Sequence, residues 1–175
     1  MGRYAELMQR MHVRVSSPDG NIVGVMDGTS GGSLAFEEGS YRTYTERSLE
    51  RQLAALGKLM VVGRRRAQRE ALQTATGFAA AADDPAESDD PKHRRYLERW
   101  AQLTCEAMSP GECVYLSATG MRDWTVVIKD GTLRRLDETE LLAEVHGAVM
   151  RLLDDQRDKE NALFHEIYQP QKGAR

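Results

Sequence analysis

Residues 13–36 read VRVSSPDGNIVGVMDGTSGGSLAF, and this stretch decides the fold. Its Val- and Ile-rich runs are separated by Ser-Pro-Asp-Gly and Asp-Gly, which are typical turn sequences because Gly and Asp tolerate positive φ. With the residues just before it, the stretch predicts three strands: MHVRVSS, NIVGVMD and GSLAF. Because the connections are short, we expect the strands to form an antiparallel meander.

The glycine-rich segment GTSGGS, residues 28–33, raises the question of a phosphate-binding loop. A P-loop needs a Lys to neutralise the β- and γ-phosphates and a following hydroxyl to bind magnesium. GTSGGS has no Lys, and the residues after it predict a strand rather than the start of a helix, which also excludes a Rossmann loop. The segment therefore predicts a turn.

Two helices are expected to flank the three strands. An i, i+3, i+4, i+7 stripe that is typical of a short helix precedes them and consists of Tyr4, Leu7, Met8 and Met11. After them, TYTE at residues 43–46 has the form of a capping box, with Thr43 as N-cap, and predicts a long helix toward Gln73. The apolar stripe of that helix is Leu49, Leu53, Leu56 and Met60. Residues 1–73 therefore predict an α-β-β-β-α unit.

A segment that cannot pack a core follows this unit. Residues 74–91, TATGFAAAADDPAESDDP, contain Phe78 as their one bulky apolar side chain, together with Ala, acidic residues and two prolines. We interpret them as an acidic linker, residues 92–170 as a second, diverged unit, and residues 171–175 as a frayed tail.

The second unit is expected to repeat the order of the first. A helical stripe is formed by Tyr96, Leu97, Trp100, Leu103, Thr104, Ala107 and Met108. CVYLSATG, DWTVVIKDG and TLRRL predict three strands, with Asp130-Gly131 matching Asp27-Gly28 and with no counterpart of residues 37–44. DETE at residues 137–140 predicts the cap of a final helix, longer than the first, through Leu141, Leu142, Val145, Val149, Leu152 and Leu153 and on to Phe164 and Ile167. The fold class is α+β: two tandem α-β-β-β-α units whose antiparallel sheets pair or pack as an intrachain pseudo-dimer.

Four features follow one another in the first unit: the SPDG turn, the strand ending in Asp27-Gly28, the strand near Leu34, and the helix that opens near a Ser-Leu pair and ends in basic residues. Their order and spacing resemble the YbaB/EbfC family of nucleoid-associated proteins. The resemblance covers residues 4–73 and, more faintly, 92–168. It implies an α-β-β-β-α fold that dimerises through its sheet and binds double-stranded DNA with little sequence preference. Similar proteins also occur beside type VII (ESX) secretion systems of actinobacteria, whereas two copies in one chain depart from the usual single unit.

Other classes of function find no support in the sequence. No apolar run is long enough to span a membrane, and no secretory leader is evident, so we expect no membrane insertion and a cytoplasmic location, in the nucleoid if DNA is bound. Cys105 and Cys113 are expected to be reduced, buried residues. The four His residues lack metal-ligand spacing and no catalytic constellation is found, so we expect no enzyme, no metal and no cofactor.

The candidate DNA-binding residues belong to one predicted helix and are Arg64, Arg65, Arg66, Arg69, Lys58 and Arg51. Arginines three or four residues apart on a helix share one sector and can neutralise phosphates without reading bases. The structural alternative is that they complement the helix dipole and keep the surface soluble. The corresponding segment of the second unit, LLDDQRDKEN at residues 152–161, is acidic, so any DNA contact is expected to be one-sided.

Two functions remain open after the sequence analysis. One is a nucleoid-associated protein that binds DNA through phosphate contacts. The other is a non-enzymatic accessory factor that binds a protein partner, for example in type VII secretion, with no DNA binding; the net charge of −3 and the acidic linker favour it. Further homodimerisation is compatible with either.

Overall fold

The computed structural model describes residues 2–28, 31–78 and 84–169. The first unit consists of α1 (Arg3–Gln9), β1 (His12–Ser16), β2 (Ile22–Asp27), β3 (Gly31–Phe36), the 3-10 turn η1 (Ser40–Thr43) and α2 (Glu46–Thr76). The second consists of the 3-10 turn η2 (Pro85–Glu87), α3 (Pro91–Ala101), β4 (Thr104–Met108), β5 (Val114–Thr119), β6 (Asp123–Ile128), α4 (Thr132–Arg135) and α5 (Glu138–Tyr168). Each unit has its own three-stranded antiparallel sheet, ordered β1-β2-β3 and β4-β5-β6. The predicted α+β class is confirmed.

The two units repeat with a constant spacing of 92 residues. β1 begins at His12 and β4 at Thr104, while α2 begins at Glu46 and α5 at Glu138; each pair of numbers differs by 92. The starts of the other strands and the ends of the long helices obey the same spacing, so the described elements contain no insertion or deletion between the copies. Both long helices have 31 residues. The expectation that the second would be longer was wrong.

The Ser-Pro turn recurs with its hydrogen bonds. Ser17 and Ser109 are buried, and each hydroxyl oxygen accepts from a backbone N–H five residues later, that of Ile22 at 2.9 Å and that of Val114 at 3.0 Å. Ser17 therefore closes the first hairpin of the first unit, and Ser109 closes that of the second. These hydrogen bonds are a physical reason for the Ser that SPDG and SPGE share.

Two predicted elements of the second unit were wrong. The expected helix through Met108 ends at Ala101, and residues 104–108 form β4 instead, in which exposed residues alternate with Cys105 and Ala107. TLRRL was predicted to be a strand but forms the helical turn α4, preceded by Gly131 at a φ of 81°. Gly131 thus matches Gly39, whose φ is 76°, and residues 129–136 are the counterpart of 37–44. Short apolar runs fit both the helical and the strand period, and strand pairing decided between them.

The N-cap of α2 is also corrected. Thr45, not Thr43, caps the helix and exchanges hydrogen bonds with Ser48, because Thr43 belongs to η1 and donates to the carbonyl of Ser40 at 2.7 Å. Asp137 caps α5 with Glu140 as its capping-box partner, as predicted. In the segment 28–33, residues 29–30 lie outside the described residues, and Gly31 already begins β3.

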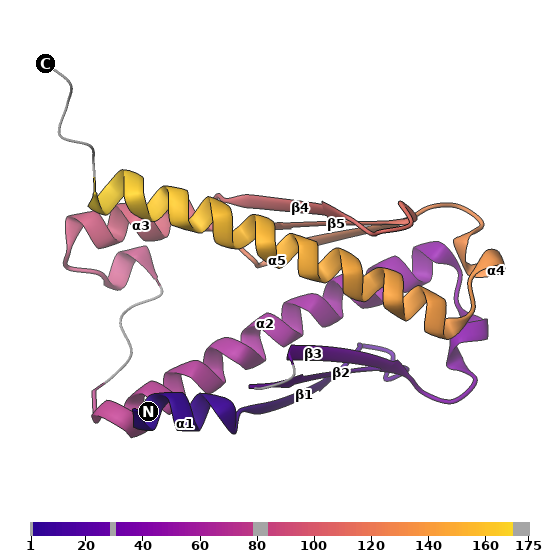
Figure 1. The fold of residues 1–175 in the computed structure, drawn as a ribbon, viewed down its shortest axis with the longest axis horizontal. Coiled ribbons are helices and arrows are strands. Elements are labelled where there is room, and N and C mark those ends of the chain that lie inside the picture. Colours follow the sequence, from indigo (N-terminus) through magenta and orange to yellow (C-terminus); the bar gives the residue numbers. More distant parts are fainter. Residues whose placement is uncertain (1, 29–30, 79–83, 170–175) are drawn as a thin grey trace, which may run out of the picture.

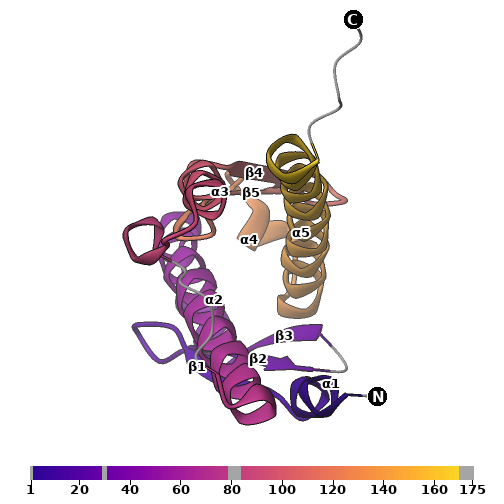
Figure 2. The same ribbon diagram turned by 90° about the vertical axis from the view of Figure 1, so that its left-hand side faces the viewer.

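The two units pack as a pseudo-dimer with exchanged contacts. α2 packs on β1 of its own unit and on β6 of the other, and α5 packs on β4 of its own unit and beside β3 of the other. The long helices cross in Figure 1, with the two sheets on opposite sides of the molecule. Figure 2, turned by 90°, shows α2 and α5 facing each other, with α3 and the second sheet at one end and α1 and the first sheet at the other.

The core belongs to both units rather than to either alone. Buried residues of α2 and α5, among them Leu49 and Leu141 with no exposed surface, form one hydrophobic cluster with the strands of the second sheet and with Ile22 of the first. The predicted stripe of α2 is confirmed, since Leu49, Leu53 and Leu56 are buried and Met60 packs against them. α2 continues to Thr76, three residues into the predicted linker, whereas residues 79–83 and the tail lie outside the described residues.

Candidate functional site

The structure separates the predicted arginine cluster into residues with different surroundings. Arg65 is half-buried and points to the second unit, where its guanidinium lies 4.7 Å from the ring centre of Trp100 and donates to the carbonyl of Gly120 at 3.5 Å. A cation over an indole ring is a stabilising contact. Arg65 therefore joins the two units instead of belonging to the outer surface.

Arg64 and Arg66 are both exposed but have different surroundings. Arg66 pairs with Glu70 one turn later, at 2.9 Å. Arg64 lies four residues after Met60, on the apolar stripe of α2, and its side chain lines the cavity between the long helices. Within the described residues Arg64 forms no hydrogen bond or ion pair.

The remaining three candidates share the outer face of α2. Arg51, Lys58 and Arg69 are all exposed, and their separations of 7 and 11 residues are close to two and three whole turns. Arg47 lies one turn before Arg51 and is exposed as well. These four residues are called the outer basic face below.

The acidic side chains at the start of α2 point away from this face. The Glu46 carboxylate accepts from the backbone N–H groups of Gly131 at 3.0 Å and Leu133 at 3.3 Å, and Glu50 accepts from that of Ile128 at 2.8 Å. Hydrogen bonds from its own backbone N–H and then from Leu133 and Gly131 hold the pKa of Glu46 below its usual value. The two acids of the first turns of α2 thus bind the second unit, and the third, Glu70, pairs with Arg66, while Arg47, Arg51, Lys58 and Arg69 make the outer face basic.

In α5 both signs bind the adjacent strand. Arg151 donates to the carbonyl of Met108 at 2.9 Å and Lys159 to that of Thr104 at 2.9 Å, while Asp155 accepts from the backbone N–H of Glu106 at 2.9 Å. Acids such as Asp158 stay exposed. The positions of α5 that correspond to Arg51, Lys58 and Arg69 carry Ala143, Met150 and Asn161. The second unit therefore has no equivalent of the outer basic face.

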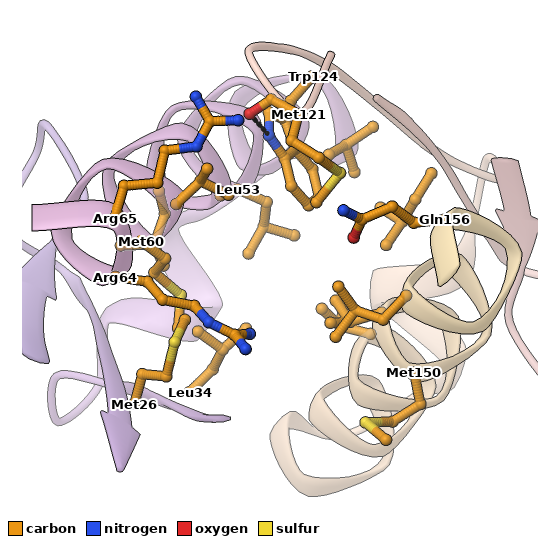
Figure 3. Close-up of a pocket in the computed structure, with 18 of the residues that line it drawn as sticks. Met26, Leu34, Leu53, Met60, Arg64, Arg65, Met121, Trp124, Met150 and Gln156 are labelled. Carbon is orange, nitrogen blue, oxygen red and sulfur yellow. Dashed lines mark hydrogen bonds between the residues drawn. The ribbon is translucent and has the colours of Figure 1, made fainter. Parts of the chain in front are cut away.

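A cavity of about 590 Å³ lies between the two long helices. Figure 3 shows Leu53 and Trp124 on its wall, Met150 below, and the side chains of Arg64 on α2 and Gln156 on α5 directed toward the open space from opposite sides. The cavity crosses the pseudo-two-fold axis, because Leu53 and Val145, Gly57 and Val149, and Arg64 and Gln156 are equivalent pairs that all line it. The position of Arg64 on the apolar stripe of α2 is the feature of the sequence that points to this cavity.

The described residues contain no cluster of potential metal ligands. Nowhere in these ranges do three or more His, Cys, Asp or Glu residues gather as potential metal ligands. Cys105 and Cys113 are buried free cysteines, as predicted, and burial raises the pKa of both thiols, which keeps them protonated at neutral pH. Among the described helices, none combines the length and the apolar composition that crossing a bilayer requires.

Comparisons with known proteins do not place the chain. No protein-family model, no curated protein and no solved structure matches it. Arguments about function therefore rest on the geometry of the outer basic face and of the cavity.

Proposed function

We propose that the chain is a DNA-binding protein of the nucleoid-associated kind, which contacts the phosphate backbone of double-stranded DNA through the outer basic face without strong sequence preference. The observation that carries the proposal is the sorting of charge on α2: Glu46 and Glu50 bind the second unit, while Arg47, Arg51, Lys58 and Arg69 stay exposed on one face. The resemblance to the YbaB/EbfC family supports the same reading.

The dimensions of this face suit a backbone contact. Arg51 and Arg69 are 18 residues apart, which at 1.5 Å per residue is about 27 Å along the helix. Each exposed cation that neutralises a phosphate releases a counterion, so the affinity depends on salt and carries no base information. Because α5 has Ala143, Met150 and Asn161 at the equivalent positions, the contact is one-sided.

The test is fluorescence anisotropy with a labelled random-sequence duplex of about 30 base pairs, at several salt concentrations. Wild type is compared with Arg51→Gln/Lys58→Gln/Arg69→Gln. If all three residues contact phosphates, the slope of log K against log salt becomes shallower by about 2.7, and binding near physiological salt is lost.

A matched control removes the same charge elsewhere. Arg95, Arg122 and Lys129 are exposed residues of the second unit, and changing all three to Gln lowers the net charge equally. We expect this variant to keep most of the affinity and most of the salt slope. Equal losses in the two triple variants would show that only net charge matters, and no binding at low salt would end the proposal.

The alternative, a protein-binding accessory factor without DNA binding, is favoured by the other long helix. α5 exposes Met150 and Phe164, at 47% and 43%, beside its acidic residues. This surface combines apolar and negative groups in the way that protein partners use. A chain that fails to bind DNA at low salt would direct attention to α5.

A further inference from the structure

We propose that the central cavity binds a single-chain aliphatic carboxylate, whose hydrocarbon chain lies among the apolar residues and whose carboxylate reaches Arg64. The proposal concerns a different surface from the outer basic face and does not depend on DNA binding. It follows from the polarity of the cavity, its asymmetry between the units and the free guanidinium at one end.

Polarity changes along the cavity from one end to the other. Toward the N-terminal halves of the long helices its wall is apolar and is formed by Leu53, Leu56, Val145 and Val149 together with Trp124 of β6. Toward the C-terminal halves it is polar and is formed by Arg64, Arg65, Gln68, Gln156, Arg157 and Glu160. An apolar chamber with polar groups at one end fits an amphiphile with one polar head.

The polar end favours a negative head group. Arg65 stacks on Trp100 and Arg157 pairs with Asp154, while Glu160 accepts from Tyr96 at 2.9 Å. Arg64 is the guanidinium among these that forms no hydrogen bond or ion pair with any described residue, and Figure 3 shows it directed into the space between the helices. A guanidinium binds a carboxylate through charge-assisted, often bidentate hydrogen bonds.

The two sheets differ at equivalent positions near the cavity. β6 presents Trp124 to α2, where the ring lies 3.0 Å from the position of a Cβ on Gly57. The equivalent residue of β3 is Gly32, where a Cβ would lie 3.6 Å from the terminal methyl of Met60, a residue that lines the cavity. The first unit therefore has no counterpart of the Trp124 ring, and the cavity wall is asymmetric between the units.

Methionines make the wall adaptable. Met26, Met60, Met121 and Met150 all line the cavity. Unbranched thioether side chains repack around ligands of varied shape at little cost. The volume of about 590 Å³ also lies within the range of about 300–1,000 Å³ that is typical of small-molecule sites. A flexible alkyl chain is the occupant that such a wall accommodates best.

Tryptophan fluorescence offers a direct test, since both tryptophans of the chain, Trp100 and Trp124, line the cavity. The full chain is titrated with dodecanoate below the concentration at which it forms micelles. We expect a saturable change in emission with one site per chain. Dodecyltrimethylammonium, which has the same chain and the opposite charge, and butyrate, which lacks the long chain, are expected to bind at least about tenfold more weakly.

One variant and a matched control localise the site. Arg64→Gln is expected to weaken dodecanoate binding about tenfold or more, because a charge-assisted hydrogen bond is lost. Arg69→Gln removes the same charge from the outer basic face and is expected to leave dodecanoate binding unchanged. For DNA the expectation is the reverse, so the two proposals fail independently.

Filling the cavity tests its location without removing a charge. Val149 lines the cavity, so Val149→Phe adds a ring to its wall. We expect this variant to retain its far-ultraviolet circular dichroism and to lose dodecanoate binding; Val61→Phe, at another lining residue, serves if it does not fold. Absence of saturable binding, equal binding of the cationic amphiphile, or undiminished binding by folded Arg64→Gln or by the folded cavity-filling variant would each overturn the proposal.

Discussion

Helices α2 and α5 occupy equivalent places in the repeat, begin with a Glu at equivalent positions and have the same length, but their outer faces differ in charge. Both helices use acids and cations in packing: Glu46 and Arg65 of α2 bind backbone groups of the other unit, and Asp155 and Lys159 of α5 bind backbone groups of β4. The exposed positions Arg51, Lys58 and Arg69 of α2 are Ala143, Met150 and Asn161 in α5, so the basic face belongs to α2.

This difference teaches how a duplicated unit diverges without changing its fold. A strand offers both N–H donors and C=O acceptors, so acidic and basic side chains can both satisfy it. Packing therefore accepts either sign, and it does not fix the charge of the outer surface. The outer positions diverged, and a basic face is present on α2 but not on α5.

The largest expected effect tests whether α2 and α5 pack equivalently in the core. Leu49 and Leu141 are identical, equivalent and fully buried. Leu49→Ala and Leu141→Ala are each expected to lower the free energy of unfolding by about 2–5 kcal/mol, as large-to-small core substitutions do. Urea denaturation measures both, with Leu59→Ala, at a 42% exposed residue, as a control that changes little. If one of the two buried substitutions is nearly neutral, the helices are not packed equivalently.

An intermediate effect is expected where the copies differ in size. Gly57→Val gives α2 the residue that α5 has at position 149, but its Cβ would meet the Trp124 ring at 3.0 Å. Overpacking of this kind costs about 1–3 kcal/mol of unfolding free energy. Combining Gly57→Val with Trp124→Leu is expected to recover part of the loss in a double-mutant cycle. Strictly additive losses would mean that the two side chains do not interact.

The smallest effect concerns charge. The pKa of Glu46 is lowered in the folded chain from a usual value of 4.5, so its carboxylate stabilises the fold above pH 4.5, and this contribution is lost as the pH falls through the lowered value. Glu46→Gln is expected to cost up to about 1 kcal/mol near neutral pH. The difference from wild type should shrink below pH 4.5.

Urea denaturation between pH 7 and pH 3 measures this difference. Glu138→Gln, at the equivalent position of α5, is the control, because Glu138 forms no hydrogen bond to the other unit among the described residues. A constant difference between Glu46→Gln and wild type at every pH would contradict the role given to the Glu46 carboxylate.

Much of the fold could be predicted from local signals. The Ser-Pro-Asp-Gly turn and the strands of the first unit and the Asp137 cap of the second depend on neighbours in the chain, and the structure confirms them. Residues 104–108 were assigned to a helix because Thr, Ala and Met fit either period, and only pairing with β5 makes them a strand. The spacing of 92 residues relates β4 to β1 and α4 to η1, so the repeat itself indicates both elements.

The candidate site was predictable to a lesser degree. Helical spacing predicted that arginines of residues 64–69 share an exposed sector, with Lys58 and Arg51 further back on the same helix. Arg51, Lys58 and Arg69 are exposed on one face, whereas Arg65 binds Trp100 and Arg64 lines the cavity. Those partners come from α3 and α5, far along the chain, and helical spacing contains no information about them.

The sequence by itself determined the elements of the first unit, the final capped helix and the presence of a repeat, because turns, caps and apolar periodicity act between residues that are close in the chain. Only the tertiary structure decided that residues 104–108 form a strand, which charges turn inward and where a cavity remains. Those outcomes depend on contacts between residues far apart in the chain, such as Trp124 against Gly57 and Arg65 against Trp100.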